Sequence, residues 1–276
     1  MSEDAAPQPE RLEGAPHPRD TARLIGQDAA QQVFVDAFNT GRLHHAWMLT
    51  GPRGVGKATL AWQIARFLLA TPAPDPDAMF ADPPPETLDI PTDHPVSLRI
   101  ASGGEGRIRN VTRTINPDTK KLRKEIVADD IRALNGFFQM SAPDGGYRVV
   151  IIDDADLMNT TAANALLKML EEPPARALLI LISHQPSGLL PTIRSRCRTL
   201  PLRTLDAGEV AQGECAGRQH RCARSTFGRL CGRGNAPFLA GWRGALCRTR
   251  VAAGHPSPHG PGPCPQAGRA RRRARR

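Results

Sequence analysis

The stretch that most constrains this sequence is GPRGVGKAT, residues 51–59, which has the spacing of a phosphate-binding loop, G-x-x-x-x-G-K. Gly51, Gly54 and Gly56 allow the backbone to curl so that its N–H groups point inward at phosphate oxygens. Lys57 adds a positive charge for the outer phosphates. The sequence therefore predicts a nucleotide-binding loop here; the alternative is a glycine-rich structural turn.

The neighbours of this loop supply the context that the motif requires. Residues 45–50 form a short apolar run typical of a strand, and residues 57–69 are typical of a helix, whose positive dipole end favours phosphate. One position departs from the motif, because Ala58 stands where a Ser or Thr hydroxyl normally coordinates Mg²⁺. The next hydroxyl comes one residue late, at Thr59. We expect ATP and Mg²⁺ binding that is possible but weakened.

A second stretch, YRVVIIDDAD at residues 147–156, reads as a buried parallel strand followed by acids. Ligands of open α/β sheets bind at the carboxyl ends of such strands, so Asp153 is the expected Mg²⁺ ligand. Hydrolysing enzymes of this type carry a water-activating Glu at the next position, whereas this chain has the shorter Asp154. A misplacement of about 1 Å costs about 10²-fold in rate, so own ATPase activity is expected to be weak or absent. The alternative is an acidic turn after a core strand.

The remaining periodic segments alternate between helix and strand. A further buried strand is expected at residues 178–182, ending in Ser183 and His184, which could sense a terminal phosphate. The expected helices are residues 19–40, 126–140 and 159–172. This alternation predicts an α/β fold with a parallel sheet and helices on both faces.

Composition divides the chain into segments. Residues 1–18 are acidic and Pro-rich and predict a disordered leader rather than a secretory signal. Residues 19–205 form the expected nucleotide-binding domain, interrupted by a Pro-rich insertion at 71–106. Residues 107–126 suggest a strand and a turn with basic residues facing out, either a solvated face or a DNA contact. No apolar run approaches the roughly 18 residues of a membrane helix, so we expect a cytoplasmic protein.

The net charge of +10 comes from the last quarter of the chain. Residues 1–206 carry 23 Lys and Arg against 25 Asp and Glu, whereas residues 207–276 carry 14 Arg, no Lys and two Glu. Five of the six cysteines also lie there, without a C-x-x-C pair, so zinc is not indicated. With only seven Val, Leu and Phe, this segment cannot bury enough apolar surface and is expected to be disordered.

Two interpretations of this low-complexity Arg/Gly/Pro segment, residues 206–276, stay open. One is a basic tail that binds nucleic acid, in which case its deletion should abolish salt-sensitive binding. The other, which we favour, is a shifted reading frame of a GC-rich gene, because the change near Ala211 is abrupt and every basic residue becomes arginine. The two other frames of the coding DNA downstream of Leu205 distinguish these interpretations.

Several stretches together resemble the bacterial sliding-clamp loader subunits of the AAA+ class, most closely the delta-prime subunits of DNA polymerase III. They are LHHAWMLTG, GPRGVGKAT, IIDDADLMNTTAANALLKMLEEPP and the triplet Ser195-Arg196-Cys197. The resemblance covers about residues 20–205 and implies an AAA+ P-loop NTPase fold. Family members continue into a helical lid and collar, which residues 206–276 do not match. Many also carry a four-cysteine zinc site after the loop helix; residues 70–146 contain no cysteine, so no zinc site is expected.

The resemblance implies a function within the DNA polymerase III holoenzyme. The subunit would help to load the sliding clamp onto primed DNA, with the gamma/tau and delta subunits as partners. As a stator, it would supply Arg196 in trans to a neighbouring ATPase site, where the arginine stabilises the transferring phosphate. Arg196 could instead be an ordinary surface charge. The alternative function is an active, gamma/tau-like ATPase motor.

Overall fold

The computed structural model describes residues 16–21, 23–71, 83–117, 119–139, 146–206 and 208–209. The part of the expected leader up to residue 15, part of the Pro-rich insertion and the Arg/Gly/Pro segment from residue 210 onward lie outside these described residues. So do the five cysteines of that segment and its proposed change of reading frame.

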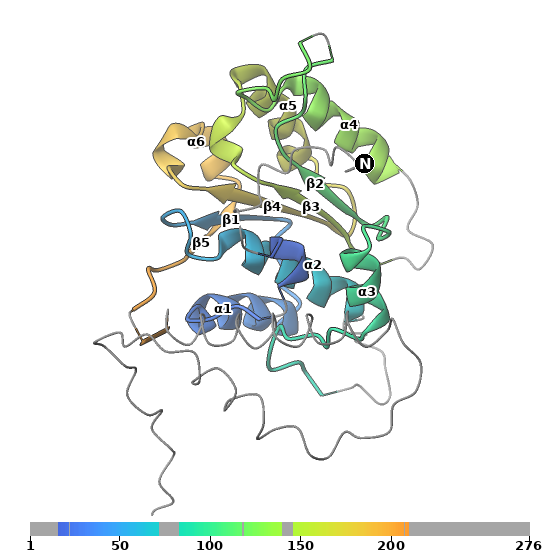
Figure 1. Ribbon diagram of the computed structural model, residues 1–276, viewed down its shortest axis with the longest axis vertical. Coiled ribbons are helices and arrows are strands. Elements are labelled where there is room, and N and C mark those ends of the chain that lie inside the picture. The colour runs from blue at the N-terminus through green and yellow to red at the C-terminus, as the bar shows by residue number, and fades with distance from the viewer. Residues whose placement is uncertain are drawn as a thin grey trace, which may run out of the picture. The chain divides into compact units, whose positions relative to one another are not determined.

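A five-stranded sheet forms the centre of the described chain (Figure 1), with the strand order β2-β3-β4-β1-β5. Each pair of neighbouring strands runs parallel. The strands are β1 (Ala46–Thr50), β2 (Ile108–Val111), β3 (Arg148–Ile152), β4 (Ala177–Ser183) and β5 (Arg198–Pro201). Since β1, β3 and β4 are entirely buried, their continuous apolar runs match a sheet that is covered on both faces.

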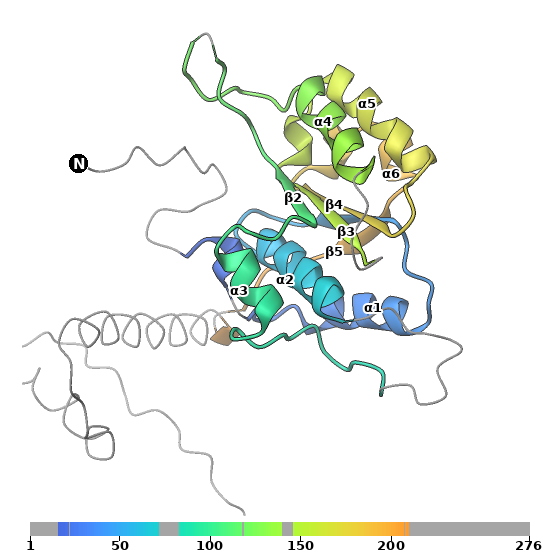
Figure 2. The same ribbon diagram turned by 90° about the vertical axis from the view of Figure 1, so that its right-hand side faces the viewer.

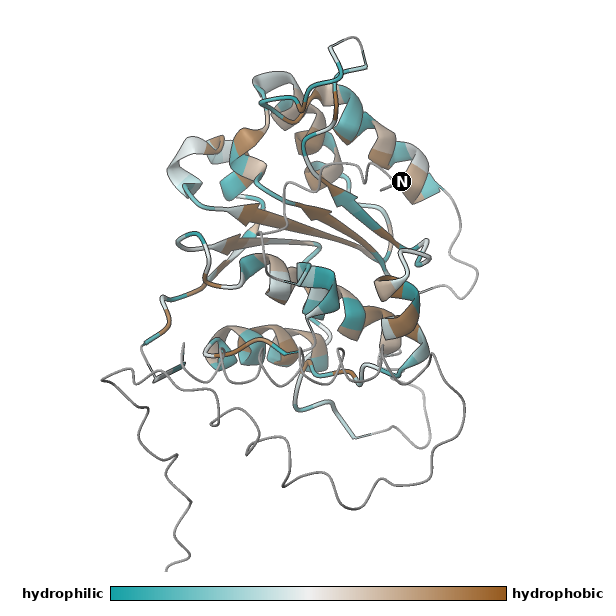
Figure 3. Cartoon of the chain, in the orientation of Figure 1, coloured by the Kyte–Doolittle hydropathy of each residue, from teal (hydrophilic) through white to brown (hydrophobic). Residues whose placement is uncertain are grey.

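Helices cover both faces of this sheet (Figure 2). Alternate strand side chains explain why: Trp47 and Leu49 belong to one apolar cluster, whereas Ala46 and Met48 belong to the other. The first face carries α1 (Asp28–Asn39), α2 (Lys57–Ala70) and α3 (Pro95–Ala101), and the second carries α4 (Ala128–Gln139), α5 (Thr160–Glu171) and α6 (Pro191–Arg194). Figure 3 shows the apolar strands between helices of mixed polarity. The expected parallel α/β fold is confirmed.

The order of the strands brings three chemically important segments to one edge of the sheet. β4 lies between β3 and β1, so the carboxyl ends of these three strands are neighbours. The segments that follow them are the GPRGVGKAT loop after β1, the two acids after β3, and Ser183 with His184 at the end of β4. This edge is where ligands of open α/β sheets bind.

The N-terminal part differs from the expected helix over 19–40. Before Asp28, where α1 begins, the residues that the structure describes form a single short 3-10 helix, Pro18–Asp20. The chain before α1 cannot continue a helix, because Gly26 has φ +73° and Gln27 is turned into the protein. His17, assigned above to the disordered leader, is instead packed in the fold: it is buried at 5% exposure, and its ring meets Trp62 edge to face.

Two further segments fall near the Pro-rich insertion. The insertion contains α3, which sequence periodicity did not predict; Pro95 opens this helix and His94 caps it by accepting from the N–H of Val96. The basic stretch after it forms β2 and a turn closed by a bridge between Ile115 and Leu122, as expected. In the part of the chain that the structure describes, no helix is long and apolar enough to cross a membrane.

Candidate functional site

The GPRGVGKAT segment forms a loop between β1 and α2, the arrangement that its sequence predicted. Gly51 shows why glycine is needed: its φ is +142°, and a Cβ there would lie 2.5 Å from the carbonyl oxygen of Leu202. Gly54 and Gly56 also have positive φ values, +83° and +94°. The loop backbone therefore passes close to the segment that follows β5, which leaves no room for a side chain at Gly51.

Lys57 begins α2 and is almost completely buried, with 3% exposure. Its ammonium group donates to the carbonyl oxygens of Gly51, at 2.7 Å, and Pro52, at 2.6 Å. Burial lowers the pKa of Lys57, and the nearby carboxylates of Asp154, Asp156 and Asp153 oppose this shift. The loop therefore already holds the cation that outer phosphates would require.

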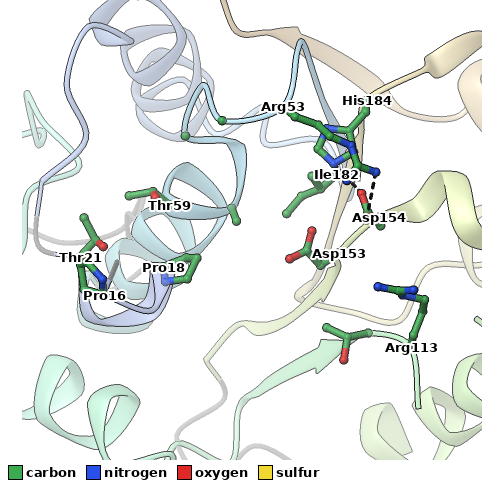
Figure 4. A pocket seen from close by; sticks show the side chains of 14 residues that line it. Pro16, Pro18, Thr21, Arg53, Thr59, Arg113, Asp153, Asp154, Ile182 and His184 are labelled. Atoms are coloured by element: carbon green, nitrogen blue, oxygen red, sulfur yellow. Dashed lines mark ion pairs between the residues drawn. The ribbon is translucent and has the colours of Figure 1, made fainter. Parts of the chain in front are cut away.

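An open cleft of about 360 Å³ lies beside this loop (Figure 4). Of the expected site residues, Gly54, Gly56, Thr59, Asp153 and Asp154 line it. Its other lining residues are Pro16, Pro18, Thr21, Arg53, Ala58, Thr112, Arg113, Ile182 and His184. Of the expected phosphate-binding residues, Gly51 and Lys57 do not line the cleft; Lys57 is buried between Gly56 and Ala58, which do. A curled loop and carboxylates at one cleft fit a nucleotide with its phosphates at the loop.

Residues that would hold Mg²⁺ are present only in part. Asp153 follows β3, where a carboxylate ligand was expected, and lines the cleft. Ala58 also lines it and carries no hydroxyl, whereas the hydroxyl of Thr59 sits one residue further along α2. A bound Mg²⁺ would neutralise phosphate charge, and the Asp153 carboxylate is the group that would hold it.

Asp154 makes contacts that the sequence did not predict. Its backbone is left-handed, with φ +57°, which aspartate tolerates better than most residues. Its carboxylate forms an ion pair with Nε2 of His184 and lies 3.6 Å from the Arg53 guanidinium, and Figure 4 shows both contacts. The carboxylate is therefore turned toward the Arg53 guanidinium and the His184 imidazole of its own chain.

The end of β4 presents His184 to the cleft, whereas Ser183 is completely buried and does not line it. The Ser183 hydroxyl donates to Oδ1 of Asp156, at 2.6 Å. Oδ2 of Asp156 accepts from the N–H groups of His184 and of Gln185, the latter at 3.1 Å. Asp156 thus fixes the strand end that carries His184. The third acid of IIDDAD was the only sequence signal for this role.

Replacement of Asp156 by alanine should destabilise the fold. It leaves three donors without a partner, among them the buried Ser183 hydroxyl, and each charge-assisted bond contributes about 1.5–3 kcal/mol. We expect Asp156→Ala to lower the free energy of unfolding by at least about 3 kcal/mol in urea titrations. Asp129→Ala is the control, because Asp129 is exposed and, within the described part of the chain, its carboxylate pairs with Arg132 alone. Equal midpoints for the two variants would contradict this role.

The pKa of His184 is lowered, first by burial and then by the charge of Lys57, while Asp154 acts in the opposite direction. The unfolded chain therefore binds a proton at this residue more readily than the folded chain. Stability should fall as the pH drops below about 6.5, the ordinary histidine value, until the lower folded pKa is reached. His184→Gln should flatten this part of the curve. Urea unfolding between pH 7.5 and 5 measures it, and an unchanged slope would contradict the assignment.

Arg196 lies on the second face of the sheet and does not line the cleft. It follows α6, in the triplet whose Cys197 is buried among the apolar residues of that face. Burial raises the pKa of the Cys197 thiol to about 12, so this thiol serves packing rather than nucleophilic chemistry. Arg196 itself is half-exposed, with its guanidinium 2.9 Å from Glu171 and 3.0 Å from the carbonyl oxygen of Thr192.

No group of three or more His, Cys, Asp or Glu side chains that could hold a metal ion occurs among the described residues. The expected absence of zinc stays a prediction.

Residues 26–206 match the family described as "DNA polymerase III, delta subunit". DNA polymerase III subunit delta' of Pseudomonas aeruginosa is 39% identical over 163 residues, which are 55% of this chain and 41% of that protein. DNA polymerase III subunit gamma/tau of Mycobacterium tuberculosis is 31% identical over 196 residues, 68% of this chain and 29% of that protein. The chain thus spans less than half of either relative.

Among solved structures, the Thermotoga maritima RuvB Holliday junction branch migration motor is 19% identical, with a TM-score of 0.40. The match covers 71% of this chain and 52% of that one. At this level of similarity we draw no functional conclusion from it.

Proposed function

The chain belongs to the DNA polymerase III delta-subunit family, and from that premise we propose that it acts as a delta-prime-like stator of the clamp loader. In this role it helps to load the sliding clamp onto primed DNA, as part of the DNA polymerase III holoenzyme. Its contribution to ATP hydrolysis is Arg196, offered to the nucleotide of an adjacent subunit. The gamma/tau and delta subunits are the proposed partners.

The observation that carries this proposal is the placement of Arg196. The side chain is half-exposed and outside the chain's own cleft, while Cys197 beside it anchors the backbone in the core. A fixed guanidinium on a rigid surface element suits an arginine that acts across a subunit boundary.

The composition of the cleft supports a weak or absent ATPase activity of the chain's own. Ala58 removes one metal ligand, and Asp154 is shorter than the glutamate that activates water. In addition, His184 and Arg53 already engage the Asp154 carboxylate. Nucleotide binding through Lys57 and the loop remains compatible with this arrangement.

A gamma/tau-like motor is the second candidate, because the cleft is formed and gamma/tau proteins are about as similar as some delta' relatives. The Mycobacterium tuberculosis gamma/tau protein is 31% identical to the chain, and the Bacillus subtilis delta' protein is 30% identical. A motor would hydrolyse ATP at its own loop, in a Lys57-dependent reaction.

ATP turnover by the isolated full chain separates the two candidates. We expect no steady hydrolysis above that of Lys57→Ala, because the chain lacks part of the machinery that activates water. A fluorescent ATP analogue, titrated into both proteins, reports whether the loop binds nucleotide independently of hydrolysis. Steady turnover that disappears in Lys57→Ala would contradict the stator role and favour the motor.

A further inference from the structure

Arg196 is held by a second residue, Glu171, whose role the proposed function leaves open. Glu171 is the last residue of α5, within the sequence NALLKMLEEPP. Its Oε1 lies 2.9 Å from Nη2 of Arg196. On the other side, Nη1 of Arg196 donates to the carbonyl oxygen of Thr192, 3.0 Å away. The guanidinium is therefore bound at both terminal nitrogens, by one acceptor from α5 and one from α6.

The elements that carry these acceptors are fixed relative to each other. Leu166 and Leu170 of α5 pack in the same buried cluster as Ile193 of α6 and Cys197. The hydroxyl of Ser195 also donates to the Thr192 carbonyl oxygen, at 3.1 Å, and so closes the end of α6. Packing thus sets the separation between Glu171 and the Arg196 backbone, and the pair does not depend on a mobile loop.

The contacts leave Arg196 able to bind another anion. A guanidinium has five N–H donors in a planar fork, of which the Glu171 and Thr192 contacts occupy two. The side chains of Arg196 and Glu171 are 37% and 50% exposed, so the pair lies at the surface, where a partner can approach it. Glu171 can therefore orient the guanidinium without occupying all its donors.

We propose that Glu171 is a positioning residue for Arg196: it holds the guanidinium in the orientation in which a neighbouring subunit's triphosphate receives it. This inference rests on the proposed function of Arg196. An arginine side chain has about 2 kcal/mol of rotamer entropy. Because the Glu171 contact already restricts the side chain, less conformational entropy is lost when the subunits associate. Since catalysis by such an arginine depends on orientation, loss of the hold lowers the rate rather than the affinity for ATP.

The neighbouring Glu172 provides a matched control. It is exposed, belongs to the same sequence motif, and its side chain has no ion pair or hydrogen bond with the described residues. Glu171→Ala and Glu172→Ala remove the same charge one residue apart. Glu171→Gln keeps an oxygen that can accept from Arg196 but removes the charge, so it should recover part of the activity.

The experiment uses the full chain in two measurements. In the isolated chain, the rate at which phenylglyoxal modifies Arg196 is followed by mass spectrometry. This rate reports how firmly the Glu171 ion pair holds the guanidinium. We expect it to rise about threefold in Glu171→Ala and to stay unchanged in Glu172→Ala. In the complex with the gamma/tau and delta subunits, kcat for ATP should fall about 3- to 10-fold in Glu171→Ala with KM unchanged, and Glu171→Gln should recover part of it.

Arg196→Gln in the same complex separates this inference from the proposed function. If Arg196→Gln lowers kcat while Glu171→Ala behaves like Glu172→Ala, the positioning role is wrong and the stator proposal stands. If Arg196→Gln leaves kcat unchanged, the stator proposal itself is wrong. Equal modification rates of Arg196 in the two alanine variants overturn the positioning role whether or not the subunits assemble.

Discussion

Replacing Arg196 with glutamine should lower ATP hydrolysis at the adjacent subunit's site by about 10³-fold, the lower end of what arginines of this kind contribute. The physical reason is that the guanidinium stabilises charge that develops on the transferring phosphate, and an uncharged amide of similar size does not. Nucleotide binding by this chain should stay unchanged, because Arg196 does not line its cleft. Phosphate release in a single turnover of the assembled complex measures the effect.

Arg194→Gln is the matched control for this prediction. Arg194 is the exposed last residue of α6, two positions before Arg196, and changing it removes the same charge. Arg196→Lys adds a second comparison, because a lysine keeps the charge but loses the planar fork of donors. A complex in which Arg196→Gln and Arg194→Gln hydrolyse ATP equally fast would refute the trans role.

The features predicted correctly from the sequence are those that depend on neighbours along the chain. The buried strands β3 and β4 are continuous apolar runs, and the curled loop between β1 and α2 follows from glycines and Lys57 within nine residues. Helix α5 begins where Asn159 caps it, one residue after the expected start. These elements can be predicted from the sequence, because periodicity and capping are properties of short sequence windows.

The features missed depend on contacts between distant residues. The start of α1 is set by Gln27. Its side chain forms hydrogen bonds with the backbone of Val55 and Arg203, which hold this residue outside the helix. Helix α3 was missed because residues 71–106 were assigned to a Pro-rich insertion, although proline, here Pro95, also favours the first turn of a helix. No pattern near Asp156 indicates that its three donors lie 27 to 29 residues further along the chain.

The second large effect expected is a gain of activity. Ala58→Thr combined with Asp154→Glu should raise the chain's own ATP turnover by about 10²-fold. The first change restores the hydroxyl that binds Mg²⁺, and the second extends the carboxylate by about 1 Å toward the attacking water. Both positions line the cleft, so neither new group needs to pass through the core. Steady-state phosphate release by the isolated full chain measures the gain.

The gain must come from the cleft itself, so the same double change on a Lys57→Ala background should show no activity. Some of the gain will be offset, because Asp154 has φ +57°, and glutamate adopts this left-handed backbone less readily than aspartate, at a cost of about 1 kcal/mol. The new glutamate must also leave the His184 contact that now holds Asp154. Adding His184→Gln to the double variant removes this competitor and should raise turnover further. If the double and triple variants bind nucleotide as the parent does and still show no turnover, positions 58 and 154 are not what limits hydrolysis.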